Sequence, residues 1–299
     1  MNGSLPTPTV TGSSRAVPLT LIGVGGAGAK LVGRGHGQPD RWIRSVVDSD
    51  QGTLGSVSTA QRLAVGAGTT RGLGCGGDVA YARELAEAAV TEIQGTVSRG
   101  GLILLVAGAG GGVGAGMTPV VARCARAAGA LVLALVVEPF DFEGRLRRKN
   151  ADQALSALEG VCDVVLRVSN QAIARIEPPT ASVPDLLAAA DHYVLDIVQG
   201  LLGLVEGPSH LPVGFAELER WARARQGSGV VAHAAAEGAE RAQSLWSQLA
   251  GHPLLDSGAQ LREASGVLVR VSGGPDLRRD ELELLQHEFE NCCPQAQLL

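Results

Sequence analysis

Aromatic residues and excess positive charge are both scarce in this sequence. Phe, Trp and Tyr together make up 3% of the 299 residues, and the formal net charge is −5. Proteins that hold single-stranded nucleic acid stack its bases on aromatic side chains, and proteins that hold a duplex carry a basic surface. The composition therefore argues against a nucleic-acid partner.

The sequence also lacks a cysteine framework, a signal peptide and a membrane-spanning run. Its five cysteines are scattered without a CxxC spacing and its six histidines are dispersed, so no metal site built from side chains is expected. The longest apolar runs, 101–107 and 129–137, have the length of buried strands, which argues against direct membrane insertion. The expected location is a reducing cytoplasm.

Glycine, by contrast, is abundant, and six glycines fall within residues 108–116. An apolar run precedes this stretch, and Pro119 with a helix-like segment follows it. Glycines let the backbone approach a ligand closely, and the N–H groups at a helix start attract an anion. The pattern predicts a phosphate cradle. A flexible linker is the alternative, which the close apolar flanks disfavour.

A second glycine-rich turn lies near the start of the chain. Residues 23–28 read Gly-Val-Gly-Gly-Ala-Gly and follow the apolar residues 19–22, as in the dinucleotide-binding pattern Gly-x-Gly-x-x-Gly. Neither turn continues into the Gly-Lys-Ser/Thr of a Walker loop. Together, the two turns are suited to hold both ends of one polyphosphate.

Short apolar segments alternate with helix-like segments along the chain. The predicted strands are residues 19–24, 43–47, 102–107, 131–137, 164–168 and 266–271. The predicted helices are residues 27–33, 79–97, 119–128, 147–158, 183–204, 215–225, 231–249 and 280–289, and residues 64–77 are predicted to be a loop. This alternation is typical of a parallel sheet covered on both faces, which binds nucleotides at the carboxyl ends of its strands.

Several of these segments carry the motifs of a known family. Residues 110–116 read Gly-Gly-Gly-Val-Gly-Ala-Gly, residues 66–76 are rich in glycine, and residues 138–147 read Glu-Pro-Phe-Asp-Phe-Glu-Gly-Arg-Leu-Arg. With residues 23–28, they resemble in order the nucleotide loops of the tubulin/FtsZ GTPase family, in its bacterial FtsZ branch. The similarity extends over residues 19–290, and the chain resembles a divergent form with a shortened C-terminal part.

The resemblance implies an α/β fold with three parts. These are a Rossmann-like GTPase domain of the tubulin/FtsZ type, a long central helix and a truncated α+β second domain. The expected boundaries are a disordered leader at 1–17, the nucleotide-binding domain at 18–182, the central helix at 183–206 and the second (activation) domain at 207–299. The family's second domain continues with strands that have no counterpart here, so we expect an open strand edge.

The resemblance also implies GTP or GDP as the cofactor, with Mg²⁺ held through the nucleotide phosphates. Asp50 would lie near those phosphates, Glu143 would hold the ribose and Asn170 would read the guanine edge. The implied binding residues are Gly25, Gly26, Ala27, Gly28, Ala29, Lys30, Asp50, Thr70, Gly110, Gly111, Gly112, Val113, Gly114, Ala115, Gly116, Glu143, Arg147, Asn170 and His192. Without the resemblance, Glu143 and Arg147 would be interpreted as an exposed i,i+4 ion pair worth about 0.2–0.5 kcal/mol.

Two positions of the implied base pocket depart from the family pattern. Lys30 replaces an asparagine, and His192 replaces an aspartate that pairs with two guanine donors. A neutral histidine offers a single acceptor, and the neighbouring Asp191 points about 100° away around a helix. Relaxed base specificity is therefore an alternative to selective binding of guanine nucleotides.

A third departure concerns hydrolysis. Where FtsZ has Asn-x-Asp-Phe-Ala-Asp, a segment that completes the neighbouring subunit's site, residues 212–217 read Pro-Val-Gly-Phe-Ala-Glu. Glu217 alone keeps a carboxylate, so it is the catalytic candidate, and hydrolysis is expected to be slow or absent. The expected partner is a second copy bound head-to-tail, or a standard FtsZ filament at the division site. The alternatives are a non-polymerising scaffold and a standard active division GTPase.

Overall fold

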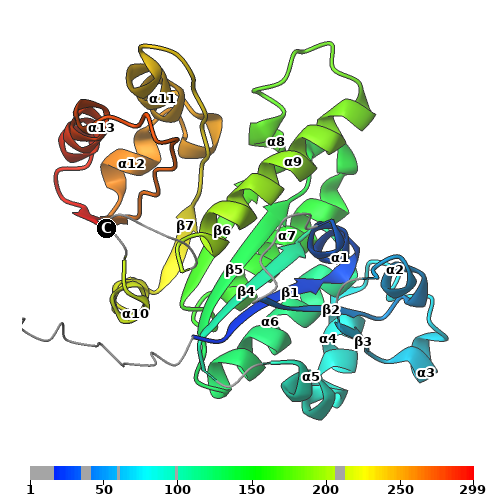
Figure 1. The fold of residues 1–299 in the computed structure, drawn as a ribbon. Helices are drawn as coiled ribbons and strands as arrows, with labels where there is room; N and C mark the ends of the chain where they lie inside the picture. The colour runs from blue at the N-terminus through cyan, green and yellow to red at the C-terminus, as the bar shows by residue number, and fades with distance from the viewer. Residues whose placement is uncertain (1–16, 35–41, 59–60, 98–99, 206–212) are drawn as a thin grey trace, which may run out of the picture.

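The computed structural model describes residues 17–34, 42–58, 61–97, 100–205 and 213–299 (Figure 1). Residues 1–16 of the expected leader, and Pro212 of the segment expected to affect hydrolysis, lie outside the described residues. Within the described chain, no helix combines the length and the apolar character needed to span a bilayer.

Seven parallel strands form the main sheet, in the order β3-β2-β1-β4-β5-β6-β7. Their bounds are β1 Leu19–Val24, β2 Trp42–Asp48, β3 Gln61–Ala64, β4 Leu102–Gly108, β5 Leu131–Glu138, β6 Val164–Ser169 and β7 Gly227–Val230. The order reverses between β1 and β4, because β2 and β3 extend to one side of β1 and the later strands to the other. Ligands of doubly wound sheets bind at such a switch point.

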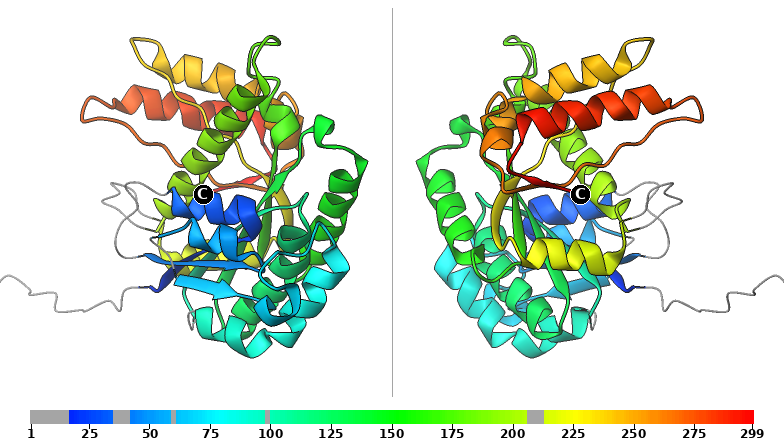
Figure 2. Two further views of the ribbon diagram at one scale, coloured as in Figure 1. Left: turned by 90° about the vertical axis from the view of Figure 1, so that its right-hand side faces the viewer. Right: turned by 90° about the vertical axis from the view of Figure 1, so that its left-hand side faces the viewer.

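Helices cover both faces of this sheet (Figures 1 and 2). One face packs against α4 (Val79–Ala88), α5 (Val90–Thr96), α6 (Gly112–Ala127) and α7 (Arg145–Leu158). The other packs against α1 (Gly25–Gly33), α9 (Val183–Leu202) and α10 (Phe215–Arg223). Because both faces are covered, β4 and β5 are continuous apolar runs that are almost entirely buried. The expected α/β Rossmann-like fold is confirmed.

A smaller unit lies beyond β7, with α11 and α13 side by side (Figures 1 and 2). Its elements are α11 Arg241–Ala250, η2 Pro253–Leu255, α12 Ala259–Glu263, β8 Gly266–Val267, α13 Arg279–Cys292 and β9 Gln297–Leu298. Trp246 of α11 meets Phe289 of α13 edge to face, with ring centroids 5.1 Å apart. β8 and β9 form a separate two-stranded parallel sheet. The unit therefore has its own small apolar core.

The start of α6 differs from the sequence prediction. The helix begins at Gly112 rather than at Pro119, so Pro119 lies inside it and half of the glycine run is helical. Glycine has a poor intrinsic preference for a helix. Close packing overrides that preference, because a Cβ at Gly114 would lie 2.1 Å from the carbonyl oxygen of Gly108. The cradle is thus a helix terminus more than a loop.

Other predicted elements were also wrong in extent. The helix predicted at 79–97 is divided at Ala89 into α4 and α5, and the helix predicted at 231–249 is reduced to α11, since residues 231–237 have no regular structure. The strand predicted at 266–271 is only β8, and the loop predicted at 64–77 contains α3 (Ala67–Thr70). Strands β3 and β7 were not predicted. β7 joins the main sheet although it belongs to residues 207–299, the expected second domain.

Candidate nucleotide-binding site

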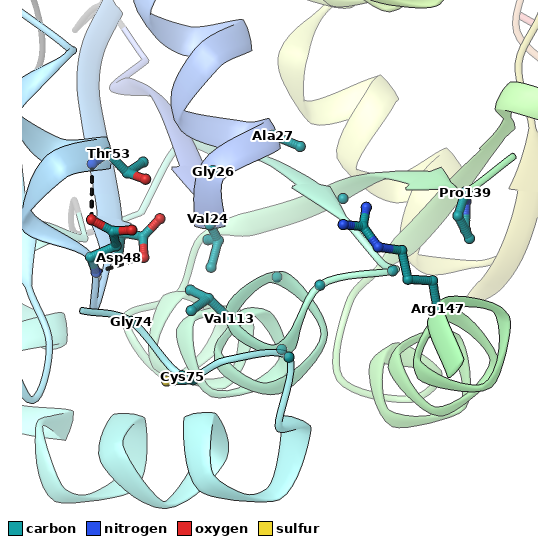
Figure 3. A pocket seen from close by; sticks show the side chains of 18 of the residues that line it. Val24, Gly26, Ala27, Asp48, Thr53, Gly74, Cys75, Val113, Pro139 and Arg147 are labelled. Atoms are coloured by element: carbon teal, nitrogen blue, oxygen red, sulfur yellow. Dashed lines mark hydrogen bonds between the residues drawn. The ribbon is translucent and has the colours of Figure 1, made fainter. Parts of the chain in front are cut away.

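A pocket of about 470 Å³ opens where β1, β2, β4 and β5 end at their carboxyl termini (Figure 3). The turn after β1, residues 73–77, the turn after β4 and the start of α7 form its walls. It therefore lies at the switch point between β1 and β4. Both glycine-rich turns of the sequence meet there.

The two turns are in direct contact through their glycines. Gly25 has a φ of +76°, which L side chains rarely adopt. A Cβ at this position would also lie 2.9 Å from the backbone nitrogen of Gly114. The starts of α1 and α6 can therefore approach each other because Gly25 has no side chain.

Both of these helices begin without a side-chain cap. The N-cap residues Val24 of α1 and Gly111 of α6 accept no hydrogen bond through a side chain, whereas Asp78 caps α4 and Ser182 caps α9. The N–H groups of an uncapped first turn and the positive end of the helix dipole attract an anion. Two such termini in one pocket are suited to a polyphosphate.

Two aspartates lie at the end of the pocket formed by β2. The Asp48 side chain is 2% exposed, and one of its oxygens, Oδ1, accepts a 3.0 Å hydrogen bond from the N–H of Asp50. Burial raises the pKa of the Asp48 carboxyl above its ordinary value. Oδ1 of Asp50 caps α2 (Gln51–Gly55), accepting from the N–H groups of Gly52 at 2.7 Å and Thr53 at 3.2 Å. These carboxylates and the Thr53 hydroxyl are hard oxygen donors of the kind that Mg²⁺ prefers.

Glu143 and Arg147 form the ion pair that their spacing suggests, and both line the pocket. Figure 3 shows the side chain of Arg147 there. Oε2 of Glu143 lies 2.5 Å from Nη1 of Arg147, and Oε1 accepts a 2.8 Å hydrogen bond from the N–H of Phe140. The ion pair and a contact with a ligand are therefore compatible, because the paired side chains already face the pocket.

Asn170, the first residue of α8 (Asn170–Ile173), also lines the pocket. Its Oδ1 is buried and has no hydrogen-bond partner within the described residues. A buried unpaired acceptor costs about 1–3 kcal/mol. A donor on a ligand, such as a ring N–H or amino group of a purine base, would satisfy it.

The two departures in the implied base pocket do not lie where the sequence placed them. Neither Lys30 nor His192 lines the pocket, and His192 is exposed on α9. Asp191 instead faces α1, where Lys30 forms an ion pair with it and Nη1 of Arg34 lies 2.9 Å from its Oδ2. The structure does not bring His192 to the pocket wall, and its expected role at the base stays a prediction. Adjacent helical residues diverge, and the turn of α9 directs Asp191 toward α1.

The structure brings most of the other predicted residues together. Those that line the pocket are Gly25, Gly26, Ala27, Asp50, Gly110, Gly111, Gly112, Val113, Gly114, Glu143, Arg147 and Asn170. Those that do not line it are Gly28, Ala29, Lys30, Thr70, Ala115, Gly116 and His192. Gly28 instead permits close packing, since a Cβ there would lie 2.3 Å from the Val106 carbonyl oxygen. The hydroxyl of Thr70 donates to the Ser49 carbonyl oxygen at 3.3 Å.

Sequence reasoning missed Asp48, Thr53, Leu73 and Cys75 among the lining residues. A signal existed for Asp48, which ends a predicted strand beside Asp50, and for Thr53, which follows Asp50 by three residues. Leu73 and Cys75 lie within residues 66–76, which resemble a nucleotide loop of the family, so a signal existed for them as well. The Cys75 thiol lies 3.2 Å from the Ser49 hydroxyl. Burial raises the pKa of this thiol, so it is not a reactive thiolate.

Glu217, the catalytic candidate, lies far from this pocket. It is exposed in the first turn of α10. β7 follows α10 and runs parallel to the other strands, so α10 ends at the amino-terminal edge of the sheet (Figure 1). The pocket is at the opposite edge. Within one molecule, Glu217 cannot reach a ligand in the pocket.

Residues 18–178 match the model of the tubulin/FtsZ family, GTPase domain. Among solved structures, the fold is similar to an empty FtsZ dimer from M. jannaschii, with 26% identity over 96% of this chain and 85% of that chain, and a TM-score of 0.85. It is also similar to a GTPγS-bound protofilament of CetZ2 from Haloferax volcanii (24% identity, 94% of this chain and 87% of that chain, TM-score 0.74). A GDP-bound CetZ1 monomer from the same organism shares 21% identity over 94% of this chain and 88% of that chain, with a TM-score of 0.73.

At identities under 25%, the two CetZ structures support the fold alone. The family model, in contrast, covers more than half of the chain, including both glycine-rich turns and Asn170. The chain therefore belongs to the tubulin/FtsZ family.

Proposed function

We propose that this protein binds GTP or GDP, assembles head-to-tail with further copies of itself or accompanies a division filament in the cytoplasm, and hydrolyses GTP slowly or not at all. The observation that carries the proposal is the pocket at the switch point, which combines two uncapped helix termini with the unpaired Oδ1 of Asn170.

The chemistry of the pocket supports a nucleotide with its phosphates at one end and its base at the other. The starts of α1 and α6 suit the phosphates, and the Glu143 carboxylate suits the ribose hydroxyls. Oδ1 of Asn170 suits a purine donor. The GTPγS- and GDP-bound states of the CetZ structures are consistent with this assignment.

Mg²⁺ fits the residues at the β2 end of the pocket. The ion would neutralise part of the phosphate charge when bound. Asp48, Asp50 and Thr53 would hold it, directly or through water, since all three line the pocket. The same carboxylates would repel an uncompensated polyphosphate, so nucleotide affinity is expected to depend on a divalent cation.

Self-assembly is supported by what surrounds the pocket. Leu73, Phe142 and Leu146 are 80%, 56% and 65% exposed, and they belong to segments that form the pocket walls. Exposed apolar surface beside a ligand site favours a protein interaction there. Glu217 is at the opposite edge of the sheet, so a second copy seated on the pocket rim would bring its own α10 toward the bound phosphates.

Slow hydrolysis is supported by the residues at the start of α10. Gly214 is the N-cap of this helix and has no side chain to orient water. Glu219 is committed to an ion pair with Arg223 at 2.9 Å. Glu217 is then the remaining carboxylate in the first turn. Phosphoryl transfer relies on the positioning of water and on electrostatics, so these losses lower the rate.

Three measurements on the purified full chain test the proposal. Nucleotide is extracted by heat and identified by chromatography, phosphate release is followed with added GTP and Mg²⁺, and assembly is followed by sedimentation. Bound guanine nucleotide with little phosphate release and GTP-dependent pelleting is expected. Nucleotide without pelleting would favour a non-polymerising scaffold, and rapid phosphate release would favour an active division GTPase. Equal competition by ATP would show relaxed base specificity.

A further inference from the structure

A buried asparagine joins the two loops that form the phosphate end of the pocket. Asn150 of α7 is 4% exposed. Its Nδ2 donates one hydrogen bond to the carbonyl oxygen of Gly110 and another to that of Gly77, each at 3.2 Å. Gly77 and Gly110 both line the pocket, but they belong to segments that are far apart in the chain.

The chemistry of the side chain suits this double contact. The amide of asparagine carries two N–H donors on one nitrogen, so it can satisfy two carbonyls at once. An aspartate of the same size could only accept, and a leucine, which has the same branched shape but is larger, could neither donate nor accept. The loops also touch, since a Cβ at Gly112 would lie 2.7 Å from the carbonyl carbon of Gly77. Asn150 therefore holds two backbones that are already in contact.

Fixing these carbonyls also fixes the N–H groups that face a ligand. In a trans peptide, the C=O of one residue and the N–H of the next point in opposite directions, and the described chain has no cis peptide. Anchoring the Gly110 carbonyl on Asn150 thus directs the N–H of Gly111 away from Asn150. Gly111 lines the pocket, and the space beside its Cα is open.

The same helix carries the pocket side chain Arg147, three residues earlier and so on the same helix face. The buried residues of α7 that follow Asn150, among them Ala151 and Ala154, pack in the core with α6. α7 is therefore anchored in the core at the point where Asn150 reaches the loops.

We propose that Asn150 is a positioning residue for phosphate binding, holding residues 73–77 and the start of α6 as one cradle without contacting the nucleotide itself. This inference rests on the proposed function. The positioning role of Asn150 concerns only the end of the pocket that holds the phosphates. Loss of the Asn150 amide should weaken every phosphate-bearing guanine ligand and leave recognition of the nucleoside unchanged.

The test compares the affinities of GTP, GDP and guanosine for the full chain, measured by competition against a fluorescent guanine nucleotide. Asn150→Leu should weaken the binding of GTP and GDP by about tenfold or more, since the buried carbonyl of Gly110 and the part-buried carbonyl of Gly77 lose their donor, while the affinity for guanosine changes less than twofold. Asn150→Thr retains one hydroxyl donor and should give a smaller loss. Gln153→Leu, at an exposed position of the same helix, is the matched control and should leave the affinities for GTP, GDP and guanosine unchanged.

Hydrogen exchange provides the readout that a general loss of stability would not mimic. In Asn150→Thr, exchange should increase at residues 74–77 and 110–114 while the strands keep their protection. Equal losses for GTP and guanosine, or unchanged GTP affinity in Asn150→Leu with a folded circular dichroism spectrum, would overturn the inference. A wild-type chain that binds no guanine nucleotide would instead overturn the proposed function.

Discussion

The hydroxyl of Tyr193 lies 2.9 Å from Nε2 of His252, which connects the long helix α9 to the C-terminal unit. Nδ1 of His252 accepts a 3.1 Å hydrogen bond from the N–H of Leu254, so the proton of the neutral ring is on Nε2. The Tyr193 hydroxyl also accepts from the N–H of His233 at 2.7 Å and donates to the carbonyl oxygen of His233 at 3.2 Å. All of its hydrogen-bonding capacity is used.

Acid should weaken this connection. Burial, followed by the charge of His233, lowers the pKa of His252 below its ordinary value, and a second ring proton would face the N–H of Leu254. Because the pKa of the folded state is the lower one, the stabilisation is present above the unfolded-state pKa of about 6.5 and is lost as the pH falls through the folded-state value. The free energy of unfolding, measured by urea titration between pH 7.5 and 5, should decrease.

The matched variants for this prediction are His252→Asn and His287→Asn. The asparagine oxygen at position 252 can accept from the Leu254 N–H and does not titrate, so the decrease in unfolding free energy between pH 7.5 and 5 should become smaller. His287 is exposed on α13, and its replacement should leave the pH dependence close to that of the wild type. Identical slopes for the two variants would contradict the assignment to His252.

Removal of the Tyr193 hydroxyl should destabilise the protein at neutral pH. Tyr193→Phe leaves Nε2–H of His252 and the N–H of His233 without an acceptor, and the expected loss is about 1–3 kcal/mol in the free energy of unfolding. Tyr81→Phe is the control, since the Tyr81 hydroxyl makes no hydrogen bond within the described chain. Chemical denaturation of the two variants in parallel measures the difference, and equal losses would contradict the prediction.

Two glycines of one turn should differ in their response to the addition of a methyl group. Gly114→Ala places a Cβ 2.1 Å from the Gly108 carbonyl oxygen, and overpacking of this kind costs about 1–3 kcal/mol or more. Gly111→Ala meets nothing within 4 Å, and its φ of −90° suits any residue, so stability should change by less than about 0.5 kcal/mol. Thermal unfolding without ligand distinguishes the two. A destabilised Gly111→Ala would show that the turn is packed differently.

Asn170 should contribute to ligand affinity more than to stability. Asn170→Ala removes a buried acceptor that has no partner in the described chain, so the ligand-free protein should be unchanged or slightly more stable. The affinity for GTP should fall about tenfold, because a hydrogen bond to the base is lost. Thermal melting and equilibrium binding measure the two effects. A large loss of stability with unchanged GTP affinity would assign Asn170 a structural role instead.

The strands were easier to predict than the helix boundaries, for physical reasons. β1 was predicted to the residue, because both faces of its sheet are covered and its sequence is largely apolar, with Thr20 as the one polar residue. The start of α6 was missed because Pro119 is typical of a first helical turn, whereas tertiary packing extends the helix back to Gly112. The helix predicted over residues 231–249 failed in its first half, where residues 231–237 have no regular structure. There Val231 packs against the main core and Ala232 against the core of the C-terminal unit.

The glycine-rich turns and the ends of the strands predicted where the site lies. The positions of its other side chains depend on how helices rotate and pack, which the hydrophobic periodicity of the sequence does not specify. His192 and Asp191 are adjacent in sequence, and only the rotation of α9 decides which of them faces α1. Asn150 follows a run of basic residues that is typical of an exposed helix face. Its burial is set by how α7 packs beside α6.

In chain order, Val24 is the first residue that lines the pocket and Asn170 is the last. All residues up to Asn170 must therefore be synthesised before the pocket is complete. β7 and the C-terminal unit contribute nothing to its walls. The wall residues are thus complete once Asn170 has been added, whereas the sheet face that packs against α9 and α10 is covered only later in synthesis. A ligand that binds the pocket would therefore favour the folded domain by mass action only after these two helices have packed.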